Sequence, residues 1–344
     1  MVGAAGSARL PDGRPVPGDV AAVVSTSGTT AEPRQVVLTR AAMEASANAV
    51  SVALGGVASD DRWLCCVPLH YVAGLAIVAR SYFCRTAITV HPSFELAAVA
   101  AAAGPADGPR CTLVSLVPTM LTRLMDAGAP LGRFRRVLLG GAPVPLPLRQ
   151  RAESGGARIN ATYGLSETGG GCVHDGEPLT GVEISFSAEG EILVRGAVVM
   201  RGYHRDPAAT ERAFTPDGWL RTGDLGRLDA DGRLQVIDRL KDVVITGGVK
   251  VSPAAVECVL AEHPLVLDVG VVGQPDDEWG ERVVACVVPR SRLERPTLGD
   301  LRRFAAGRLT AAELPRQLRY VESVPRSSGG KVLRRELRSG RGPV

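Results

Sequence analysis

The sequence predicts an α/β protein of two domains: a large N-terminal domain with a mainly parallel sheet and added antiparallel strands, and a small α+β C-terminal domain. Strand-like and helix-like segments alternate from about residue 20 to residue 162, which is typical of a parallel sheet covered by helices. After residue 181 short strands follow one another, and after residue 238 helices and strands mix again. A length of 344 residues fits about two domains, which we place at 1–238 and 239–344.

Apolar runs and capping signals define the expected elements. Thr39 is suited to cap the first helix. In the first domain, strands are expected at 19–24, 62–68, 86–90, 111–117, 136–139 and 158–162, and helices at 40–54, 72–81, 94–103, 118–125 and 147–153. Antiparallel strands are expected within 191–203 and 219–239, with a turn at Asp231 and Gly232. The second domain should contain helices at 253–261, at 298–309 and from Lys331 onward, and strands at 266–272, 283–288 and 318–324.

Composition argues against several classes of protein. No apolar run reaches the roughly 18 residues of a membrane-spanning helix, and the N-terminus lacks a signal peptide pattern, so a cytoplasmic protein without membrane association is expected. The seven cysteines include no Cys-x-x-Cys pair, which argues against a disulfide framework and a zinc site. The 40 basic residues are spread among 36 acidic ones and aromatics make up only 4%, so nucleic acid is not an expected partner.

Lysine is scarce in this chain. Of the 40 basic residues only Lys241, Lys250 and Lys331 are lysines. Lysine and arginine are not interchangeable where a compact ammonium must meet a transferring group. The three positions are therefore candidates for function, although chance survival is the alternative.

A cluster of hydroxyl residues and glycine follows the first expected strand, in the order Thr26, Ser27, Gly28, Thr29, Thr30. Such a turn presents backbone N–H groups and hydroxyls to phosphate oxygens. An ordinary polar turn is the alternative. The other common phosphate loop, G-x-x-x-x-G-K-[ST], is absent from the chain.

The segment NATYGLSETGGG, residues 160–171, follows the last parallel-type strand, where open α/β sheets bind ligands. Tyr163 is suited to stack on a purine, Ser166 to bind phosphate and Glu167 to hold Mg²⁺. A glycine-rich loop with incidental charge is the alternative. A G-x-S-x-G nucleophile elbow is excluded because Thr168 stands where its second glycine belongs.

Two further motifs lie towards the C-terminus. Asp224 and Arg239 are suited to ribose hydroxyls, and Gly247 and Gly248 allow a thin ligand arm to approach the backbone. Lys331 follows two glycines and precedes a short basic segment. Taken singly, these fragments also fit hairpin chemistry and a solvated tail.

These four motifs, in this order, resemble the adenylate-forming superfamily of acyl-CoA synthetases, peptide-synthetase adenylation domains and luciferases, over residues 20–337. PLHYVAGLAIVARS, LLGGAPVP, TYGLSETGGGCVHDGEPLTGVEI and DVVITGGVKVSP are most similar to the o-succinylbenzoate–CoA ligases of menaquinone biosynthesis. The resemblance implies an AMP-forming acid–thiol ligase with a mobile C-terminal domain. It uses ATP, Mg²⁺ and coenzyme A to adenylate a small carboxylic acid and then transfer the acyl group to the thiol.

The resemblance also implies residue roles. The ATP site would consist of Thr26, Ser27, Gly28, Thr29, Thr30, Arg34, Gly140, Gly141, Ala142, Tyr163, Gly164, Ser166, Asp224 and Arg239. Lys331 would be the adenylation lysine, Glu167 would bind Mg²⁺ and Lys241 would be the hinge. Coenzyme A would pass Gly247, Gly248 and Lys250, and the acyl group would contact His70, Gly74, Arg80, Gly169 and Gly170.

The second carboxylate of o-succinylbenzoate requires a cation or oriented donors, for which His70 and Arg80 are candidates. A structural histidine and an arginine at a helix C-terminus are the alternatives.

The sequence departs from the family pattern at two places. The phosphate loop continues with Ala31, Glu32, Pro33 and Arg34 where relatives have Gly, any residue, Pro and Lys, and Gly330 replaces a hydroxyl residue. Two alternatives therefore stay open: delivery of another aromatic acid to CoA, a carrier protein or an amine, and an inactive acyl-binding homologue. Short members of the family often pair, which leaves room for a homodimer.

Overall fold

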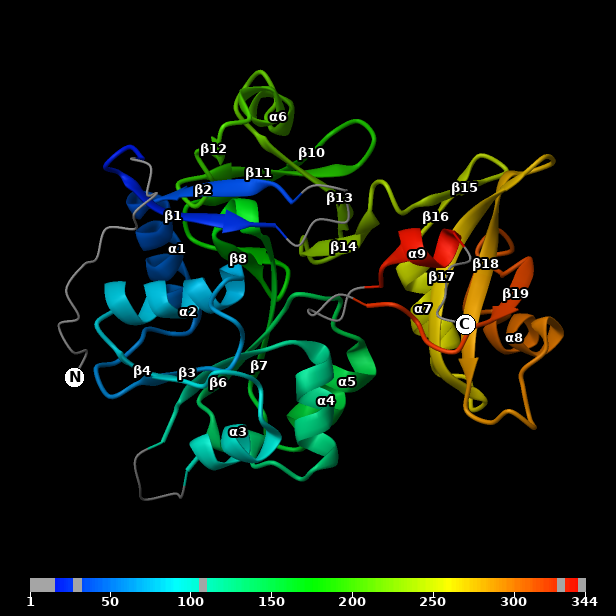
Figure 1. Cartoon of the computed structure of the whole chain (residues 1–344), viewed down its shortest axis with the longest axis horizontal. Helices are drawn as coiled ribbons and strands as arrows, with labels where there is room; N and C mark the ends of the chain where they lie inside the picture. The colour runs from blue at the N-terminus through cyan, green and yellow to red at the C-terminus, as the bar shows by residue number, and fades with distance from the viewer. Residues whose placement is uncertain (1–15, 27–32, 105–109, 327–331, 340–344) are drawn as a thin grey trace, which may run out of the picture.

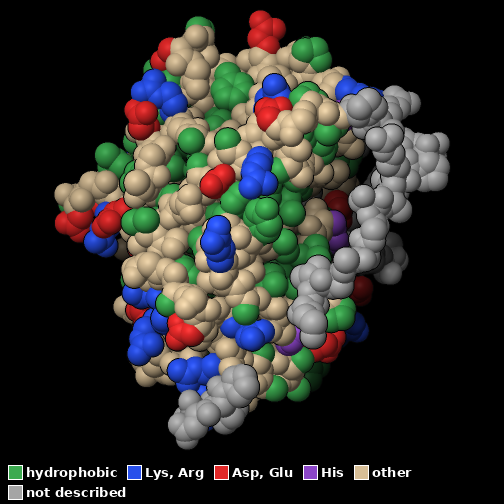
Figure 2. Space-filling model, turned by 90° about the vertical axis from the view of Figure 1, so that its left-hand side faces the viewer, with side chains coloured by type: hydrophobic (Ala, Val, Ile, Leu, Met, Phe, Trp, Pro, Cys, Tyr) green, Lys and Arg blue, Asp and Glu red, His purple; other side chains and the backbone are tan. Residues whose placement is uncertain are grey.

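The computed structural model describes residues 16–26, 33–104, 110–326 and 332–339. The chain forms a large lobe and a smaller lobe that contains the C-terminal third (Figure 1). Figure 2 shows the end of the large lobe remote from the small lobe, where acidic and basic side chains are interspersed. Within the described residues, no helix combines the length and hydropathy needed to cross a bilayer.

A seven-stranded sheet forms the base of the large lobe, in the order β4-β3-β5-β6-β7-β8-β9. The first five strands in this order are parallel, whereas β8 and β9 continue antiparallel. The strands are β3 (Arg62–Cys65), β4 (Ala87–Val90), β5 (Leu113–Leu116), β6 (Arg136–Leu139), β7 (Ile159–Leu165), β8 (Gly170–His174) and β9 (Glu177–Pro178). The expected parallel sheet is thus confirmed for strands β3 to β7.

Helices cover both faces of this sheet. On one face lie α1 (Arg40–Ala53) and α2 (Val72–Phe83), and on the other lie α3 (Leu96–Ala102), α4 (Pro118–Asp126) and α5 (Leu146–Ser154). Side chains alternate along β3 and the residue after it, so that Trp63 and Cys65 enter one core while Leu64 and Cys66 enter the other. The parallel strands therefore present their carboxyl ends at one edge, between two packed helical layers.

The first expected strand lies in a different sheet. The run at 19–24 was predicted within the alternating pattern, but β1 (Val20–Ser25) pairs antiparallel with β2 (Gln35–Thr39), and β2 pairs with β12 (Gly202–Tyr203). Strand β2 was not predicted, because its five residues stand directly between a polar loop and helix α1. The expectation that β1 belongs to the parallel sheet was wrong, because β1 pairs with β2, the strand that was not predicted.

A second antiparallel sheet completes the large lobe. It has the order β10-β11-β13-β14, with β10 (Val182–Phe186), β11 (Glu191–Gly196), β13 (Leu220–Leu228) and β14 (Leu234–Arg239). The predicted turn between β13 and β14 is confirmed, since Asp229 N–H donates to Arg233 O and Gly232 N–H donates to Asp229 O. Helix α6 (Pro207–Ala213) packs beside β12 (Figure 1).

The small lobe has its own sheet and its own core. Its strands are β15 (Val244–Thr246), β16 (Val249–Val251), β17 (Val266–Asp276), β18 (Gly280–Pro289) and β19 (Gln317–Tyr320), and its helices are α7 (Pro253–Leu260), α8 (Leu298–Ala305) and α9 (Arg334–Arg338). Helix α8 ends four residues before the predicted end, because the chain turns at Gly307, where φ is +79°. Among the described residues, no strand of this sheet pairs with a strand of the large lobe.

Candidate active site

Three of the sequence-predicted residues meet where β7, β13 and β14 come together. The Tyr163 hydroxyl donates to Asp224 Oδ2 at 2.9 Å, and Arg239 Nε lies 2.7 Å from Asp224 Oδ1. The β13–β14 register places Asp224 directly opposite Arg239. Asp224 is only 4% exposed, and burial beside this carboxylate raises the pKa of Tyr163. The result is an aromatic ring next to a fixed carboxylate–guanidinium pair.

Glu167 lies four residues after Tyr163, in the 3-10 turn η2 (Ser166–Thr168). Buried Thr168 fixes this turn, since its hydroxyl accepts from Leu165 N–H at 2.9 Å and lies 2.7 Å from Gly170 O. Ser166 is half-buried at the start of η2, and Gly169 ends it in the left-handed region at φ +65°. The turn therefore holds Glu167 on a short, internally bonded loop.

Tyr203 is a site residue that the sequence alone did not reveal. Its hydroxyl donates to Glu167 Oε1 at 2.8 Å, and the guanidinium of Arg34 lies 5.1 Å from the centre of its ring. Burial and the Glu167 carboxylate raise the pKa of Tyr203 to about 12. No local pattern identifies this tyrosine, because its partners lie 36 and 169 positions earlier in the chain.

The donor set at Glu167 fits a magnesium ion. Oε2 has no hydrogen bond to any of the described residues, so one carboxylate oxygen keeps its lone pairs. Mg²⁺ is usually held by one or two carboxylates together with nucleotide phosphates. The described part of the chain contains no group of three His, Cys, Asp or Glu side chains that would form an all-protein metal cage. Glu167 thus suits an ion that arrives with a nucleotide.

Glycines bring the backbone close at the carboxyl ends of β6 and β7. A Cβ on Gly140 would lie 2.3 Å from Thr162 Oγ1, and a Cβ on Gly164 would lie 1.9 Å from Gly170 O. Gly141 has φ +80°, which L side chains rarely adopt, and half-buried Ala142 follows it. These glycines therefore let the strand ends pack closely beside Tyr163.

The base of the phosphate loop is held closed. Thr26 N–H donates to Arg34 O at 2.8 Å, and Arg34 N–H donates to Thr26 Oγ1 at 3.2 Å. The loop residues Ser27, Gly28, Thr29 and Thr30, the departures Ala31 and Glu32, and also Gly330 and Lys331 lie outside the described residues. Their predicted roles stay predictions.

A pocket of about 640 Å³ lies between β1 and the start of α2. Its lining includes Thr26, Leu69, His70, Tyr71 and Leu75. His70 is exposed and its ring lies 4.2 Å from that of Tyr71. A Cβ on Gly74 would lie 2.5 Å from Pro68 O, so this glycine is needed for the close turn into α2.

Arg80 lies in the interior rather than in this pocket. It is 6% exposed, its guanidinium lies 5.5 Å from the centre of the Trp63 ring, and a Cβ on Gly170 would lie 3.7 Å from Nη2. Nε has no hydrogen-bond partner, and none of the ion pairs found among the described residues includes this guanidinium. Burial lowers the pKa of Arg80 to about 10. His70 and Arg80 therefore occupy different environments, and Arg80 is a buried cation for which the described residues supply no anion.

His174 adds a second buried polar group near the same glycines. It is 5% exposed, and neither ring nitrogen has a hydrogen-bond partner among the described residues. A Cβ on Gly171 would lie 3.4 Å from its Nε2. Burial, followed by the charge of Arg80, lowers the pKa of His174 to about 4. The sequence alone does not single out His174, whose burial shows only in the folded chain.

The remaining predicted residues lie at and beyond the junction of the lobes. Lys241 is in the turn after β14, where Leu240 N–H donates to Gly223 O at 2.8 Å. Gly247 and Gly248 form the β15–β16 turn with positive φ. Lys250 Nζ donates to Glu189 O of the large lobe at 3.2 Å, which is a direct contact across the junction.

Comparison with known proteins gives a consistent result. Residues 3–204 match the AMP-binding enzyme family and residues 255–331 match the AMP-binding enzyme C-terminal domain. A probable 2-succinylbenzoate–CoA ligase of Mycobacterium tuberculosis is 40% identical over 334 residues, which cover 94% of this chain and 85% of that protein.

Two solved structures of o-succinylbenzoate coenzyme A synthetase from Bacillus subtilis resemble the chain at 32% identity. The complex with the acyl-adenylate intermediate has a TM-score of 0.84 and covers 92% of this chain and 68% of that one. The complex with ATP and a magnesium ion has a TM-score of 0.83 and covers 92% and 69%.

Proposed function

The chain belongs to the AMP-binding enzyme family, and from this premise we propose that it is an ATP-dependent carboxylate–CoA ligase that acts on o-succinylbenzoate. The observation that carries the proposal is the cluster of Tyr163, Asp224 and Arg239 beside Glu167. A ring, a fixed carboxylate–guanidinium pair and a free carboxylate oxygen match the base, ribose and metal-bound phosphates of a nucleotide. The similar proteins named above act on, or are bound to, the same acid and nucleotide.

In the first half-reaction, a carboxylate oxygen of the acid attacks the α-phosphorus of ATP and the bond to pyrophosphate breaks. The protein contributes chiefly positioning and charge neutralisation. Asp224 accepts from ribose hydroxyls, Arg34 stands at the phosphate loop, and Lys331 bridges the carboxylate and the α-phosphate. Glu167 would hold the magnesium ion, which supplies neutralisation of phosphate charge. No side-chain nucleophile is needed.

In the second half-reaction, the CoA thiol attacks the acyl carbon of the mixed anhydride and AMP leaves. We propose that residues 1–238 hold the nucleotide and the acid, while residues 239–344 turn about Lys241. This turn withdraws Lys331 and brings Gly247, Gly248 and Lys250 to the pantetheine arm. Exposed Lys241 in a short turn between two separately packed lobes is suited to such a motion.

The choice of acid rests on Arg80. A buried guanidinium without an anion is costly, and a second carboxylate on the substrate would neutralise it. The Arg80 guanidinium lies against Gly170. Gly170 and Glu167 belong to the same β7–β8 hairpin, so Arg80 is close to the loop that contains Glu167. We therefore assign Arg80, rather than His70, to the second carboxylate.

The experiment is a panel of carboxylic acids with ATP, Mg²⁺ and coenzyme A. Pyrophosphate release reports adenylation, and mass spectrometry identifies the acyl product on CoA, on a carrier protein or on an amine. o-Succinylbenzoate should give acyl-CoA far faster than benzoate or salicylate. Faster turnover of a monocarboxylate would contradict the choice of acid, and no pyrophosphate release with any acid would favour a binding protein.

We place this activity in the cytoplasm, and light scattering would test for a homodimer.

A further inference from the structure

Segment 200–203 makes two hydrogen bonds to Glu167. Met200 N–H donates to the Glu167 backbone oxygen at 2.7 Å, and the Tyr203 hydroxyl donates to Oε1 at 2.8 Å. The first bond fixes where the residue sits and the second fixes how its side chain is turned. Oε2 is left without a donor from the described residues.

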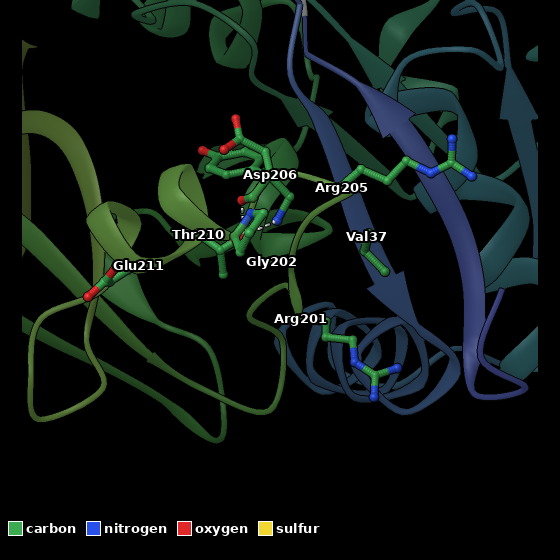
Figure 3. A pocket seen from close by; sticks show the side chains of 9 residues that line it. Val37, Arg201, Gly202, Arg205, Asp206, Thr210 and Glu211 are labelled. Atoms are coloured by element: carbon green, nitrogen blue, oxygen red, sulfur yellow. Dashed lines mark hydrogen bonds between the residues drawn. The ribbon is translucent and has the colours of Figure 1, made fainter.

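Tyr203 is itself held in place by its neighbours. Its backbone N–H donates to Thr210 Oγ1 at 2.8 Å, and its strand pairs with β2 so that Tyr203 lies opposite Val36. Figure 3 shows Gly202 and Thr210 together at the wall of a pocket of about 560 Å³, and a Cβ on Gly202 would lie 2.6 Å from Thr210 Cγ2. The backbone at Tyr203 therefore has little freedom to move away from Glu167.

Arg34 connects the same ring to the phosphate loop. Its guanidinium lies 5.1 Å from the ring centre, a cation–π contact, while its backbone closes the base of the loop through Thr26. Tyr203 thus contacts the candidate metal carboxylate through its hydroxyl and, through its ring, a cation at the predicted phosphate loop. A single side chain, half-buried, joins the two halves of the site.

We propose that Tyr203 is a positioning residue that holds Glu167 in one orientation for the magnesium ion of Mg·ATP. The inference rests on the proposed function and adds a residue to it. A free glutamate samples several rotamers, and ordering them on binding costs free energy. Partners that orient a metal ligand typically change metal affinity by roughly ten- to hundredfold when removed.

Calorimetric titration with ATP tests this, first with Mg²⁺ and then with EDTA. No acid is present, so nothing turns over. Tyr203→Phe keeps the ring beneath Arg34 and removes only the hydroxyl. Its affinity for ATP with Mg²⁺ should fall roughly tenfold or more, while its affinity in EDTA should match that of the wild type. Tyr82→Phe is the matched control, because Tyr82 is exposed and its ring also lies near an arginine, 5.7 Å from Arg40.

The possible outcomes separate the positioning role from the proposed function. An unchanged affinity of Tyr203→Phe in Mg²⁺, or an equal loss with and without the metal, would overturn the positioning role. Thermal unfolding of the variant shows whether an equal loss reflects a damaged fold. If the wild type binds ATP under neither condition, the proposed function fails, and this inference fails with it.

Discussion

Arg80 is a buried guanidinium whose Nε has no hydrogen-bond partner and for which no carboxylate is found among the described residues. Such a group destabilises the folded chain unless a ligand supplies the anion. The sequence placed Arg80 near the acyl group by resemblance, but an alternative was an arginine at a helix end. In the fold it lies in the last turn of α2 and faces Trp63 and Gly170.

Arg80→Met should raise the Michaelis constant for o-succinylbenzoate roughly a hundredfold, because truncating one partner of a buried ion pair costs about 2–5 kcal/mol. The constant for benzoate should change less than about threefold, since benzoate lacks the second carboxylate. The free energy of unfolding of the unliganded protein should not fall, as a buried unpaired charge is removed. Steady-state kinetics measures the two Michaelis constants, and urea unfolding measures the free energy of unfolding. Arg123→Met, an exposed arginine above Phe94, is the control. Equal effects on both acids would discard the assignment.

His174 makes stability depend on pH. Its pKa is about 4 in the fold and about 6.5 when unfolded, so the unfolded chain binds the proton first as pH falls. Its contribution is complete above pH 6.5 and is lost between pH 6.5 and 4. The loss amounts to about 3 kcal/mol.

Urea unfolding at pH 7.5, 5.5 and 4.5 checks this. The loss of stability between pH 7.5 and 4.5, which covers most of the titration, should be smaller in His174→Gln than in the wild type by roughly 2–3 kcal/mol. His70→Gln, at an exposed histidine, is the control. Parallel profiles for wild type and His174→Gln would contradict the account.

Among the secondary-structure elements, the sequence located those with a strong local pattern. Helix α1 begins at Arg40 as predicted, and the Thr39 hydroxyl accepts from Ala42 N–H at 3.1 Å. The short strands β2 and β12 were missed as partners, because their pairing joins residues 35–39 to residues 202–203. Tyr203 was missed for the same reason: its position at Glu167 is a product of non-local pairing, which apolar periodicity does not record.

The β7–β8 hairpin depends on a close contact between two glycines. A Cβ on Gly164 would lie 1.9 Å from Gly170 O, so Gly164→Ala must push the strands apart. Overpacking of this kind costs about 1–3 kcal/mol, and we expect the upper end because the clash is with backbone. ATP affinity should fall as well, since Tyr163 and Glu167 flank this glycine in the same hairpin.

Urea unfolding and calorimetry measure these two effects. Gly18→Ala is the control, because a Cβ at Gly18 would have nothing within 4 Å and the backbone there needs no positive φ. Full stability of Gly164→Ala together with wild-type ATP affinity would show that the hairpin is not the rigid support described here.

The two lobes pack as separate units, and the C-terminal tail belongs to the small one. Arg334 Nη2 lies 2.9 Å from Glu257 Oε2, Nη1 lies 3.9 Å from Asp242 Oδ2, and Nε donates to Val271 O. Val332 forms a bridge with Arg326. The residues on either side of 327–331 are thus fastened to the small lobe, next to the turn that contains Lys241. Motion of this lobe would carry Lys331 with it.

The sequence predicted a large N-terminal lobe and a small C-terminal lobe because the pattern of expected strands and helices changes along the chain. Its short motifs also singled out Asp224 and Arg239, which the fold brings together as an ion pair. Their role at a nucleotide stays a prediction. It did not predict Tyr203 or the unpaired state of Arg80, since both depend on contacts between distant segments. Local chemistry is visible in a sequence, whereas burial and pairing appear only after folding.

The most direct measurement compares the two half-reactions in Lys331→Ala. Adenylate formation from acid and ATP should fall on the order of a hundred- to thousandfold, as for other preorganised charge-stabilising groups. Thioester formation from supplied acyl-adenylate and CoA should stay close to the wild-type rate. Arg335→Ala, at an exposed arginine of the same tail, should leave both rates unchanged. Equal loss of both half-reactions in Lys331→Ala, or loss of neither, would contradict the proposal that Lys331 moves with the small lobe and acts in adenylation alone.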